Sequence, residues 1–328
     1  MVRHHVVTGG AGFVAFTLIG RLLEQGDHVL ALDDLSRGRR AHVEHFGCRP
    51  GFRFAAVDCA DLVAYRTVVG GAHAARAVDE VWHLAANSDI PAGIADPTID
   101  LEGTFRTTFN TLLIMREFGI PALRFASSSA IYGDLGEAAI HEDVGPLEPI
   151  SNYGAMKLAS EAQIRAAVEA FLPRADIFRF PNVVGVPATH GVMLDFIRKL
   201  ASTPEVLHVL GDGTQRKPYL HVAELVDAML FIRGHARGRH NVYNVGPQDE
   251  GIRVAEIAAL VRDRVAPAAA IRLGEGGRGW VGDVPRFRYD TDRLNGLGWR
   301  PALDSRAAVR RAVDEIAYQE AERACGRR

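Results

Sequence analysis

The stretch VVTGGAGFVAFTLIGRLLEQG, residues 6–26, runs from an apolar strand pattern through three glycines into an amphipathic helix pattern. The glycines are Gly9, Gly10 and Gly12, and Ala15 stands where many loops of this kind have another glycine. Missing side chains permit a tight turn and let a pyrophosphate approach the N-terminus of the helix. An ordinary tight turn has the same composition. The stretch therefore predicts a strand, a turn and a helix, and it predicts a dinucleotide site only if the rest of the chain supports one.

The N-terminal half of the chain repeats this alternation of short apolar runs and longer amphipathic ones. The apolar runs lie at residues 6–7, 29–32, 52–57, 81–84 and 123–126. Alternating strands and helices are typical of a parallel sheet with helices on both faces. We therefore predict an α/β fold, with a Rossmann-type doubly wound parallel sheet over residues 1–180.

After Arg179 the sequence becomes more irregular. Prolines divide it into shorter pieces at Pro181, Pro187, Pro204, Pro218, Pro247 and Pro267. Such breaks favour short elements over long ones. We expect residues 181–328 to form mainly a smaller α/β lobe that binds substrate, with segments at about 218–250 returning to the first domain.

The composition excludes several classes of protein. The 328 residues are 48% hydrophobic and 24% charged, which suffices for a large core. The net charge of −2 provides no field that would attract nucleic acid or a membrane surface. Cys48, Cys59 and Cys325 have no metal-binding spacing, and no run reaches the ~20 apolar residues of a membrane span. Because the N-terminus also has no signal-peptide pattern, we expect a cytoplasmic protein without a metal site.

A carboxylate follows the second predicted strand. Asp33 stands about twenty residues beyond the glycine loop, where a carboxylate accepts hydrogen bonds from the adenosine ribose hydroxyls. Its charge would repel a 2′-phosphate, which favours NAD over NADP. Arg37, Arg39 and Arg40 keep NADP open, because a nearby arginine can accommodate the 2′-phosphate.

Two further strand ends carry candidate cofactor contacts. Asp58 closes the third strand, where it could hydrogen-bond the adenine amino group or simply cap the next helix. The fourth strand, in VWHLAANS, ends in Ala85 and Ala86, whose small side chains would let phosphates and riboses approach the backbone. With Asp33, these positions extend the glycine loop into a predicted dinucleotide site.

Tyr153 and Lys157 lie four residues apart in a helical stretch, so their side chains project from one face. A phenol with a pKa of ~10 is a poor base at neutral pH. A nearby ammonium and a positive nicotinamide ring stabilise the phenolate, and lowering its pKa by about three units takes about 4 kcal/mol. Ser128, in FASSSAIYGD, follows the fifth strand at the edge where doubly wound folds bind ligands, although it could equally be a turn hydroxyl.

The motifs occur in the order found in a known family. They extend along nearly the whole chain, in the order TGGAGF, the strand-end Asp33, HLAA, SSSAIYG, YGAMK, RFPNVVG, GDGTQRKPYLHV and GDVPRF. The sequence thus resembles the extended short-chain dehydrogenases/reductases, and among them the NAD-dependent epimerase/dehydratase family. Within that family it is most similar to the UDP-glucose 4-epimerases, including an archaeal-looking version with THGV and GRGW segments.

The resemblance implies a role for each matching residue. Ser128 would hydrogen-bond the sugar O4, Tyr153 would shuttle its proton, and Lys157 would hold the nicotinamide ribose and tune Tyr153. The implied cofactor contacts are Gly9, Gly12, Phe13, Val14, Asp33, Asp34, Ser36, Arg37, Gly38, Asp58, Cys59, Leu84, Ala85, Ala86, Thr104, Tyr153, Lys157, Phe180 and Val183. The implied substrate contacts are Ser88, Ser128, Ser129, Tyr153, Asn182, Val192, Met193, Leu210, Lys217, Arg278 and Asp283. The implied substrate is a nucleotide-diphosphate sugar.

Three positions depart from the family pattern. Ala15 replaces the third glycine, Thr104 stands where the family usually has asparagine, and Lys217 replaces a phosphate-binding arginine. Lysine is a point charge rather than a bidentate fork. How the chain binds the diphosphate, and therefore which nucleotide it binds, stays an open question.

The two positions that precede Ile131 and Tyr132 separate related chemistries. The resemblance places there an Asp-Glu pair in 4,6-dehydratases, usually a glutamate in uronate decarboxylases and nearby a cysteine base in 3,5-epimerases, whereas this chain has Ser129 and Ala130. This difference favours inversion at C4 through a transient 4-keto sugar, with hydride transfer to and from bound NAD. The alternatives are an epimerase for another sugar (UDP-glucuronate, a UDP-N-acetylhexosamine, or a GDP-, ADP-, CDP- or dTDP-sugar), a noncatalytic NAD sensor and a simple alcohol dehydrogenase.

The family also implies a homodimer in which helices at 104–116 and 153–170 pair across a two-fold axis. Phe105, Phe109, Leu112 and Leu113 fit a buried face there. Burial inside the subunit would look the same, so the sequence alone does not separate the two.

Overall fold

The computed structural model describes residues 2–136, 138–276 and 287–326. These residues form two compact units. Unit 1 takes in the described residues of Met1–Gly133, Leu147–Arg179 and Met229–Tyr243, and unit 2 takes in those of Asp134–Pro146, Phe180–Ala228 and Asn244–Arg328. The chain therefore leaves unit 1 and returns to it twice.

Unit 1 is built on a seven-stranded sheet with the order β12-β7-β5-β4-β1-β2-β3. Its strands are β1 (His4–Thr8), β2 (His28–Asp33), β3 (Phe52–Ala56), β4 (Glu80–His83), β5 (Ala122–Ser128), β7 (Arg174–Phe180) and β12 (His240–Asn244). Strand β1 pairs in parallel with β2 and β4, β2 with β3, and β4 with β5. The order reverses between β1 and β4, which is the point where doubly wound folds bind ligands. The predicted fold class is confirmed.

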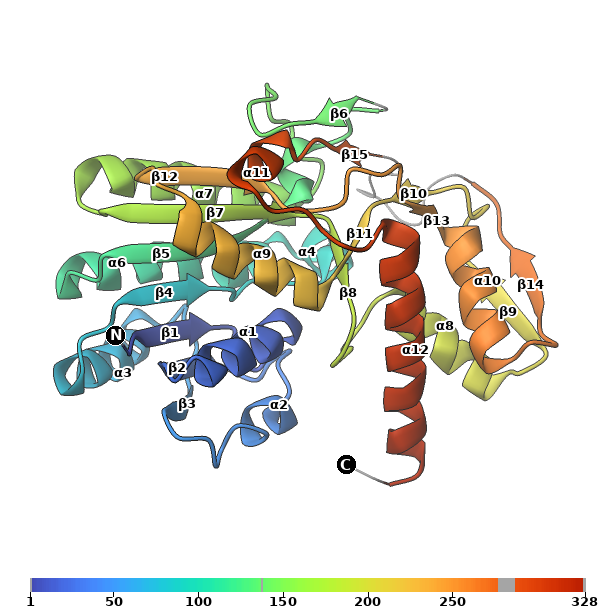
Figure 1. Ribbon diagram of the computed structural model, residues 1–328, viewed down its shortest axis with the longest axis horizontal. Coiled ribbons are helices and arrows are strands. Elements are labelled where there is room, and N and C mark those ends of the chain that lie inside the picture. The colour runs from blue at the N-terminus through green and yellow to red at the C-terminus, as the bar shows by residue number, and fades with distance from the viewer. Residues whose placement is uncertain (1, 137, 277–286, 327–328) are drawn as a thin grey trace. The chain divides into compact units, whose positions relative to one another are not determined.

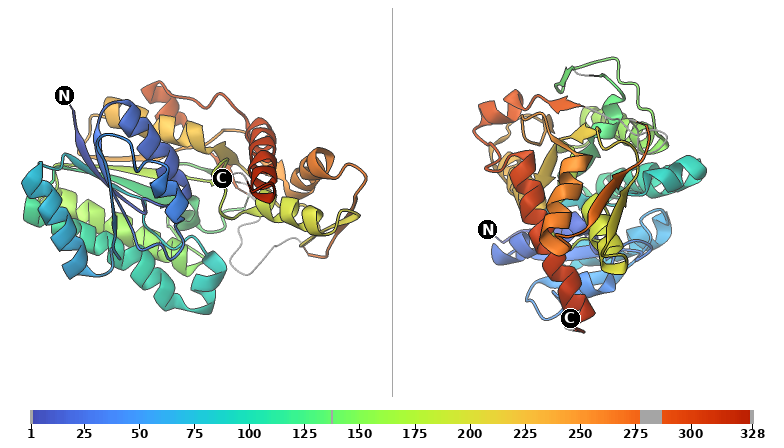
Figure 2. Two further views of the ribbon diagram at one scale, coloured as in Figure 1. Left: turned by 90° about the horizontal axis from the view of Figure 1, so that it is seen from below. Right: turned by 90° about the vertical axis from the view of Figure 1, so that its right-hand side faces the viewer.

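Helices cover both faces of this sheet (Figure 1). The helices and turns of unit 1 are α1 (Phe13–Glu24), α2 (Arg40–Glu44), α3 (Leu62–Ala75), α4 (Ile90–Ala95), α5 (Pro97–Asp100), the π-helix η1 (Leu101–Arg106), α6 (Thr107–Phe118), the 3₁₀ turn η2 (Ser129–Tyr132), α7 (Asn152–Ala170) and α9 (Val222–His235). The left view of Figure 2 shows α1 on one face and α3, α6 and α7 on the other. Helix α9 belongs to unit 1 only from Met229 onward.

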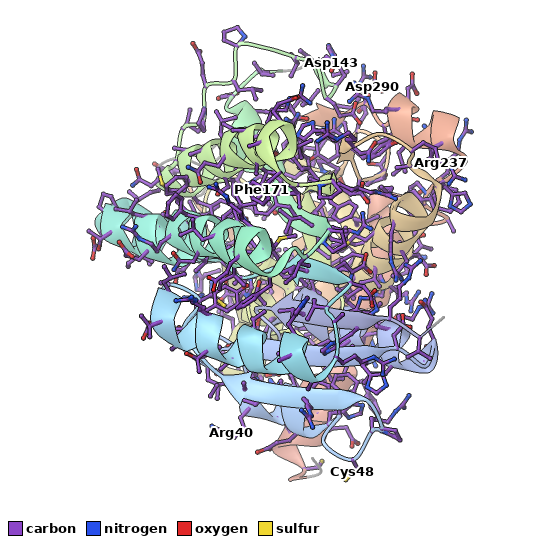
Figure 3. The ribbon with its side chains drawn as sticks, turned by 90° about the vertical axis from the view of Figure 1, so that its left-hand side faces the viewer. Arg40, Cys48, Asp143, Phe171, Arg237 and Asp290 are labelled. Atoms are coloured by element: carbon purple, nitrogen blue, oxygen red, sulfur yellow. The ribbon has the colours of Figure 1, made fainter. Side chains whose placement is uncertain are left out.

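The core of unit 1 explains why these segments take up their structures. Helix α1 buries Leu18, Ile19 and Leu22, whose three- and four-residue spacing places them on one helical face. Each apolar side chain of this size contributes about 1.5–3 kcal/mol when it is fully buried. On the other face Phe171 follows the end of α7 beside α6 (Figure 3), and the guanidinium carbon of Arg116 lies 6.0 Å from its ring centroid. Apolar packing thus holds a helical layer on each side of the sheet.

Buried charges form a network near the amino ends of the strands. Arg124 on β5 donates to Glu80 on β4 at 2.9 and 3.0 Å and also to Asp176 on β7. His5 on β1 lies 3.0 Å from Glu80. Burial acts to raise the pKa of Glu80, but the His5 hydrogen bond and the charges of Arg124 and Arg233 lower it to about 2. Because each of these charged groups lies beside a group of opposite charge, the network can stay buried inside the fold.

Unit 2 has short strands, as the prolines predict, but its last helix, α12, is long: it has 20 residues, against the expected short elements. The elements of unit 2 are β6 (Ala139–Ile140), β8 (Asn182–Val184), α8 (Val192–Ser202), β9 (Val206–Val209), β10 (Arg216–Lys217), β11 (Tyr219–His221), β13 (Ile252–Arg253), α10 (Val254–Val265), β14 (Ala270–Leu273), β15 (Arg288–Tyr289), α11 (Asp292–Leu297) and α12 (Ser305–Ala324). Strand β9 pairs in parallel with β14, and β10 pairs antiparallel with β13. Helices α8, α10 and α12 share an apolar core that includes Ile257 and Val261.

Among the described residues, none of the helices has both the length and the apolar character that crossing a membrane requires.

We expect Arg124→Ala to lower the free energy of unfolding by about 3 kcal/mol, the lower end of the range for a broken buried ion pair, because Glu80 and Asp176 lose Arg124 but keep Arg233 and Arg174 as partners. Arg165→Ala is the matched control, since it removes an exposed ion pair with Glu169 and should cost less than about 1 kcal/mol. Urea unfolding followed by circular dichroism measures both changes. Equal losses in the two variants would contradict a stabilising role for the buried network.

Candidate active site

The glycine loop closes against the end of β4. Gly9 has a φ of +65°, and a Cβ built there would lie 2.9 Å from the Ala85 nitrogen and 3.0 Å from the Leu84 carbonyl carbon. Glycine is therefore required for its conformation and for its size. Gly12, the N-cap of α1, donates to the Gly9 carbonyl at 3.0 Å. Among the described residues no side chain caps α1, and its first turn is free of acidic residues, so its N–H groups can bind an anion.

Asp33 stands at the end of β2 and faces this loop. Its Oδ2 accepts a hydrogen bond from the Ala11 N–H at 3.0 Å, and its Oδ1 accepts one from the Leu35 N–H at 2.8 Å. A Cβ at Gly38 would lie 2.5 Å from Oδ1, so glycine there makes room for the carboxylate. Burial raises the pKa of Asp33, against the two backbone hydrogen bonds. A carboxylate has about four acceptor sites, so lone pairs remain for ribose hydroxyls.

Arg37 is held by the segment that follows β4. Its Nε donates to the Ser88 hydroxyl at 3.2 Å, and its guanidinium pairs with Asp89 at 3.1 Å. Asp34 accepts hydrogen bonds from the backbone and hydroxyl of Ser36 at 3.0 and 2.7 Å, which closes the turn. Because Arg37 already has protein partners, these contacts weaken the case for a 2′-phosphate and support NAD.

The end of β3 differs in part from the sequence prediction. Asp61, rather than Asp58, caps α3 by accepting from the N–H groups of Val63 and Ala64, so the interpretation of Asp58 as a helix cap is wrong. Asp58 is exposed, and among the bonds described its carboxylate accepts only the Ala60 N–H, at 2.8 Å. Its proposed contact with adenine stays a prediction. The neighbouring residue, Cys59, is buried.

The end of β4 is tied to β1 and to η1. The Ala85 N–H donates to the Thr8 hydroxyl at 3.2 Å. Thr104, at the position where asparagine was expected, is fully buried and accepts the Asn87 N–H at 3.1 Å. Both hydroxyls hold backbone at this edge of the sheet, so Thr104 shapes the site through Asn87.

Ser128, Tyr153 and Lys157 come together at the carboxyl end of β5. A Cβ at Gly154 would lie only 2.4 Å from the Ala130 carbonyl oxygen, so α7 begins directly against η2. Ser128 hydrogen-bonds Tyr153 and also accepts the Ala130 N–H at 3.1 Å. The Lys157 Nζ lies 5.8 Å from the centroid of the Tyr153 ring. Ser128 is therefore both a turn hydroxyl and the partner of Tyr153.

Lys157 is almost completely enclosed, with 1% of its surface exposed. Its ammonium donates to the Ala126 carbonyl at 2.6 Å and lies 4.7 Å from the Phe125 ring centroid. Burial lowers the pKa of Lys157 to about 7, although the charges of Glu161 and Asp100 oppose the change. The ammonium thus depends on nearby carboxylates to stay charged.

Burial raises the pKa of Tyr153 to about 12, with the Ser128 hydrogen bond acting to lower it and the Asp100 charge acting to raise it. The phenol therefore holds its proton at neutral pH unless a further positive charge lies beside it. An oxidised nicotinamide ring carries such a charge.

Two groups next to this cluster were missed by sequence reasoning. Glu161 receives the Arg179 guanidinium at 2.6 Å, and Arg179 also donates to the Tyr132 hydroxyl at 2.9 Å. Glu161 follows Lys157 by four residues, and this spacing could have revealed it. Asp100 is fully buried and acts electrostatically on Lys157, but no local sequence pattern indicates that Asp100 belongs to the site.

Five of the remaining candidate substrate residues belong to unit 2. Val192 begins α8, Met193 packs in the apolar core, Asn182 is exposed at the start of β8, Leu210 is exposed and Lys217 lies on β10. Phe180 and Val183 lie at the end of β7 and within β8. Arg278 and Asp283 fall outside the described residues. Ser88 and Ser129 belong to unit 1, in the segment after β4 and in η2.

Unit 2 also contains a cavity of about 340 Å³. Its lining residues are Gly136, Thr214, Arg216, Glu250, Arg253, Phe287 and Arg288. Of the candidate substrate residues that the structure describes, none lines it.

We expect Gly9→Ala to reduce bound NAD by at least tenfold, because the Cβ would push the loop away from Ala85. Gly26→Ala is the control, since Gly26 has a φ of +79° but nothing within 4 Å of an added Cβ. An alanine at residue 26 has the left-handed backbone strain of about 1–2 kcal/mol, but its Cβ meets no other atom. Release of nucleotide from the denatured proteins and its quantification measure the effect. Full NAD content in Gly9→Ala would contradict the assignment.

The comparisons with known proteins agree with this geometry. The model of the NAD dependent epimerase/dehydratase family matches residues 5–246. The UDP-glucose 4-epimerase of Streptomyces lividans is 30% identical over 324 residues, which cover 94% of this chain and 94% of that protein. A crystal structure of a UDP-galactose 4-epimerase is 34% identical, with a TM-score of 0.83 and coverage of 96% of this chain and 99% of that one.

A crystal structure of the Thermus thermophilus UDP-glucose 4-epimerase in complex with NAD is 28% identical, with a TM-score of 0.82 and coverage of 95% of this chain and 98% of that one. The predicted resemblance is thus confirmed, and so is NAD as the cofactor. The chain belongs to the NAD-dependent epimerase/dehydratase family.

Proposed function

We propose that the protein is an NAD-dependent nucleotide-sugar 4-epimerase of the UDP-glucose/UDP-galactose type. The observation that carries the proposal is the cluster of Ser128, Tyr153 and Lys157 at the carboxyl end of β5, in the same unit as the glycine loop. The relatives and structures named above support the UDP-sugar as substrate. A noncatalytic sensor would need no such cluster.

The residues of unit 1 fit a reaction at a secondary alcohol. The chemistry that NAD supplies when bound is reversible hydride acceptance, which oxidises the C4 alcohol to a ketone and reduces it again without net oxidation. The Tyr153 oxygen takes the O4 proton during oxidation and returns it during reduction. Ser128, already hydrogen-bonded to Tyr153, orients O4. Lys157 supplies the positive charge that stabilises the phenolate.

The turn after β5 argues against related eliminations. Ser129 and Ala130 open η2, and neither side chain is a carboxylic acid or a thiol. A dehydratase needs a group there that can remove a carbon-bound proton and protonate a leaving hydroxyl. Without it, the ketone is only reduced again, and C4 is inverted when the ketone turns over and takes the hydride on its other face.

The remaining residue assignments belong to the same proposal. The backbone amides of Phe13 and Val14 at the start of α1 would bind the pyrophosphate, and Asp33 would bind the adenosine ribose. Residues 1–180 would bind NAD, and 181–328 would mainly bind the nucleotide sugar. Free Cys48, Cys59 and Cys325 suit the reducing cytoplasm, which we propose as the location of the protein.

We also propose a homodimer through α6 and α7. Leu112 packs inside the subunit, whereas Leu113 is 36% exposed and Phe105 and Phe109 are half-buried. Leu113 and the two phenylalanines thus remain available to a second copy. An isologous contact of these helices would bury them.

We expect Tyr153→Phe to fold, to retain NAD and to lose at least ~100-fold in turnover, because the substitution removes only the ionisable oxygen. Lys157→Met should lose both turnover and NAD. The assay converts UDP-galactose to UDP-glucose and follows NADH absorbance, which should show no net change. Gly26→Ala, which lies outside the site, serves as the activity control.

Near-normal epimerisation by Tyr153→Phe with full NAD content would exclude Tyr153 as the proton carrier. Net formation of NADH would instead identify an alcohol dehydrogenase. A panel of UDP-, ADP-, GDP-, CDP- and dTDP-sugars identifies the nucleotide, and epimerisation of another member in preference to UDP-galactose would correct the proposed substrate.

We expect the wild-type protein to have a dimeric mass at micromolar concentration and Leu113→Glu to have a monomeric one, since a charge in the apolar contact opposes association. Val63→Glu is the control, because Val63 is 75% exposed on α3 and lies outside the proposed contact. Analytical ultracentrifugation measures the masses. A monomeric wild type would remove the dimer proposal.

A further inference from the structure

A histidine that the mechanism above does not use lies completely buried at the end of β4. His83 pairs with Thr8 in the parallel register of β4 and β1, so both side chains point to the same face of the sheet. The His83 Nδ1 lies 2.7 Å from the Thr8 hydroxyl, and its Nε2 lies 3.1 Å from the Thr108 hydroxyl on α6. The imidazole therefore links β1 to α6 directly beside the glycine loop, which begins at Gly9.

The other hydrogen bonds of Thr8 determine the direction of its bond to His83. The Thr8 hydroxyl oxygen accepts the Leu84 and Ala85 N–H groups, each at 3.2 Å. A hydroxyl has two acceptor lone pairs and one proton, so these two bonds fill the lone pairs. Its own proton is left for the His83 Nδ1. Nδ1 is thus an acceptor and carries no proton.

The Thr108 hydroxyl leads to the same assignment from the other ring nitrogen. It donates to the Thr104 carbonyl at 3.0 Å, so it offers a lone pair to the His83 Nε2. Nε2 must therefore carry a proton and donate it. The Thr111 hydroxyl also lies near Nδ1, at 3.3 Å, but it donates to the Thr107 carbonyl at 2.8 Å. Both ends of the ring thus require a neutral imidazole protonated on Nε2.

A second proton on His83 would break this network. With both ring nitrogens as donors, Thr8 would meet three donors, and its own proton would lose the acceptor on His83. The surroundings also oppose that proton, because burial and the charge of Lys157 on α7 lower the pKa of His83 to about 3. From α3, the Tyr65 phenol contacts the Thr111 hydroxyl at 3.1 Å and reaches the imidazole only through it. The imidazole is therefore neutral at physiological pH.

Thr8 holds the backbone against which the glycine loop closes. The Ala85 nitrogen that donates to Thr8 is also the atom that a Cβ at Gly9 would approach to 2.9 Å. A threonine side chain can rotate among staggered positions, and turning the hydroxyl away would take this acceptor from the Ala85 N–H. The bond to His83 selects the position in which the lone pairs face the end of β4. The place of Ala85 under Gly9 thus depends on His83.

The other end of the network reaches Thr104. The Thr104 carbonyl accepts the Thr108 proton, and the Thr104 hydroxyl accepts the Asn87 N–H at 3.1 Å. Asn87 follows Ala85 by two residues. Through Thr108 on one side and Thr8 on the other, the imidazole therefore connects the hydroxyls that hold the beginning and the end of this short backbone segment.

We propose that His83 is a positioning residue of the cofactor site: as a neutral imidazole with its proton on Nε2, it orients the Thr8 hydroxyl toward the end of β4 and so keeps the backbone of Ala85 in place under the glycine loop that binds NAD. His83 acts through Thr8 and needs no contact with NAD of its own. The proposal rests on the glycine loop as the NAD site and not on the epimerase reaction.

The first test is the tautomer of His83 in the wild-type protein with its NAD. Two-bond ¹H–¹⁵N correlation spectra of protein labelled at histidine distinguish a protonated ring nitrogen from an unprotonated one. The His83 signals are those that disappear in His83→Asn or shift in Thr8→Val. We expect an unprotonated Nδ1 and a protonated Nε2 down to about pH 5, below the ordinary histidine pKa of about 6.5. A proton on Nδ1 overturns the proposal.

The second test is a double-mutant cycle, and its readout is the rate at which the purified proteins lose NAD during dialysis. Thr8→Val and His83→Leu each remove one partner of the hydrogen bond. We expect each to speed the loss of NAD by about tenfold, the order of one buried hydrogen bond. In the Thr8→Val background, His83→Leu should add no further loss, because its effect passes through the Thr8 hydroxyl. Additive effects, or an unchanged rate in His83→Leu, contradict the proposal.

His83→Asn separates a positioning role from a merely structural one. The asparagine Oδ1 is bonded to Cγ, as Nδ1 is in histidine, so it still accepts the Thr8 proton although it no longer reaches Thr108. We expect His83→Asn to retain NAD better than His83→Leu. His235→Asn, which replaces an exposed histidine on α9, is the control and should match the wild type. Equal loss of NAD in His83→Asn and His83→Leu would exclude the role proposed for Nδ1.

The same experiments separate this proposal from the proposed function. If the wild type epimerises no nucleotide sugar while Thr8→Val and His83→Leu still show non-additive losses of NAD, the epimerase proposal fails and the role of His83 stands. If the wild type epimerises UDP-galactose while the two losses are additive, the epimerase proposal stands and the role of His83 fails.

Discussion

The contact between Gly9 and the backbone at the end of β4 is the constraint on which the cofactor site depends. Because β1 and β4 are parallel neighbours, their carboxyl ends meet at one edge, and the loop after β1 must pass over Leu84 and Ala85. This path points the N-terminus of α1 along the edge. It also brings the Ala11 N–H to Asp33, so the anion site and the ribose site form together. A side chain at residue 9 would separate them.

Unit 1 handles buried charge in two ways. Near the amino ends of the strands Arg124 is surrounded by carboxylates that it neutralises, and the arrangement serves stability. At the carboxyl edge Lys157 is equally enclosed, but burial brings its pKa down to about 7, so its charge depends on its neighbours. Electrostatic effects are strong in such surroundings because water does not screen them. A site that has to move a proton gains from this sensitivity, whereas a purely structural network does not.

The site predictions that rest on family resemblance and on local spacing concern residues that lie close together in the chain. Tyr153 and Lys157 are one helical turn apart, and the glycine loop with its strand and helix spans residues 6–26. The sequence left open whether Asp58 contacts adenine or caps α3. The structure gives the cap to Asp61, since only the backbone geometry decides which carboxylate reaches the free N–H groups. The candidate substrate residues in unit 2 stay predictions, and two of them, Arg278 and Asp283, fall outside the described residues.

The sequence by itself predicted the fold class, the cofactor and the pair Tyr153 and Lys157 that we propose is catalytic, because strand and helix periodicity, glycine positions and a four-residue spacing are local properties. Only the tertiary structure decided which groups surround the site. Thr8 lies 75 positions before His83 and Thr108 lies 25 positions after it, yet the pairing of β1 with β4 and the packing of α6 bring the three side chains together. The motifs TGGAGF and HLAA contain Thr8 and His83, but neither motif shows that the two side chains meet, since hydrogen bonds between buried side chains join neighbours distant in sequence. The protonation of His83, like that of Lys157 and Tyr153, is therefore a property of the folded unit, because desolvation and the distances between groups arise only when the chain is packed.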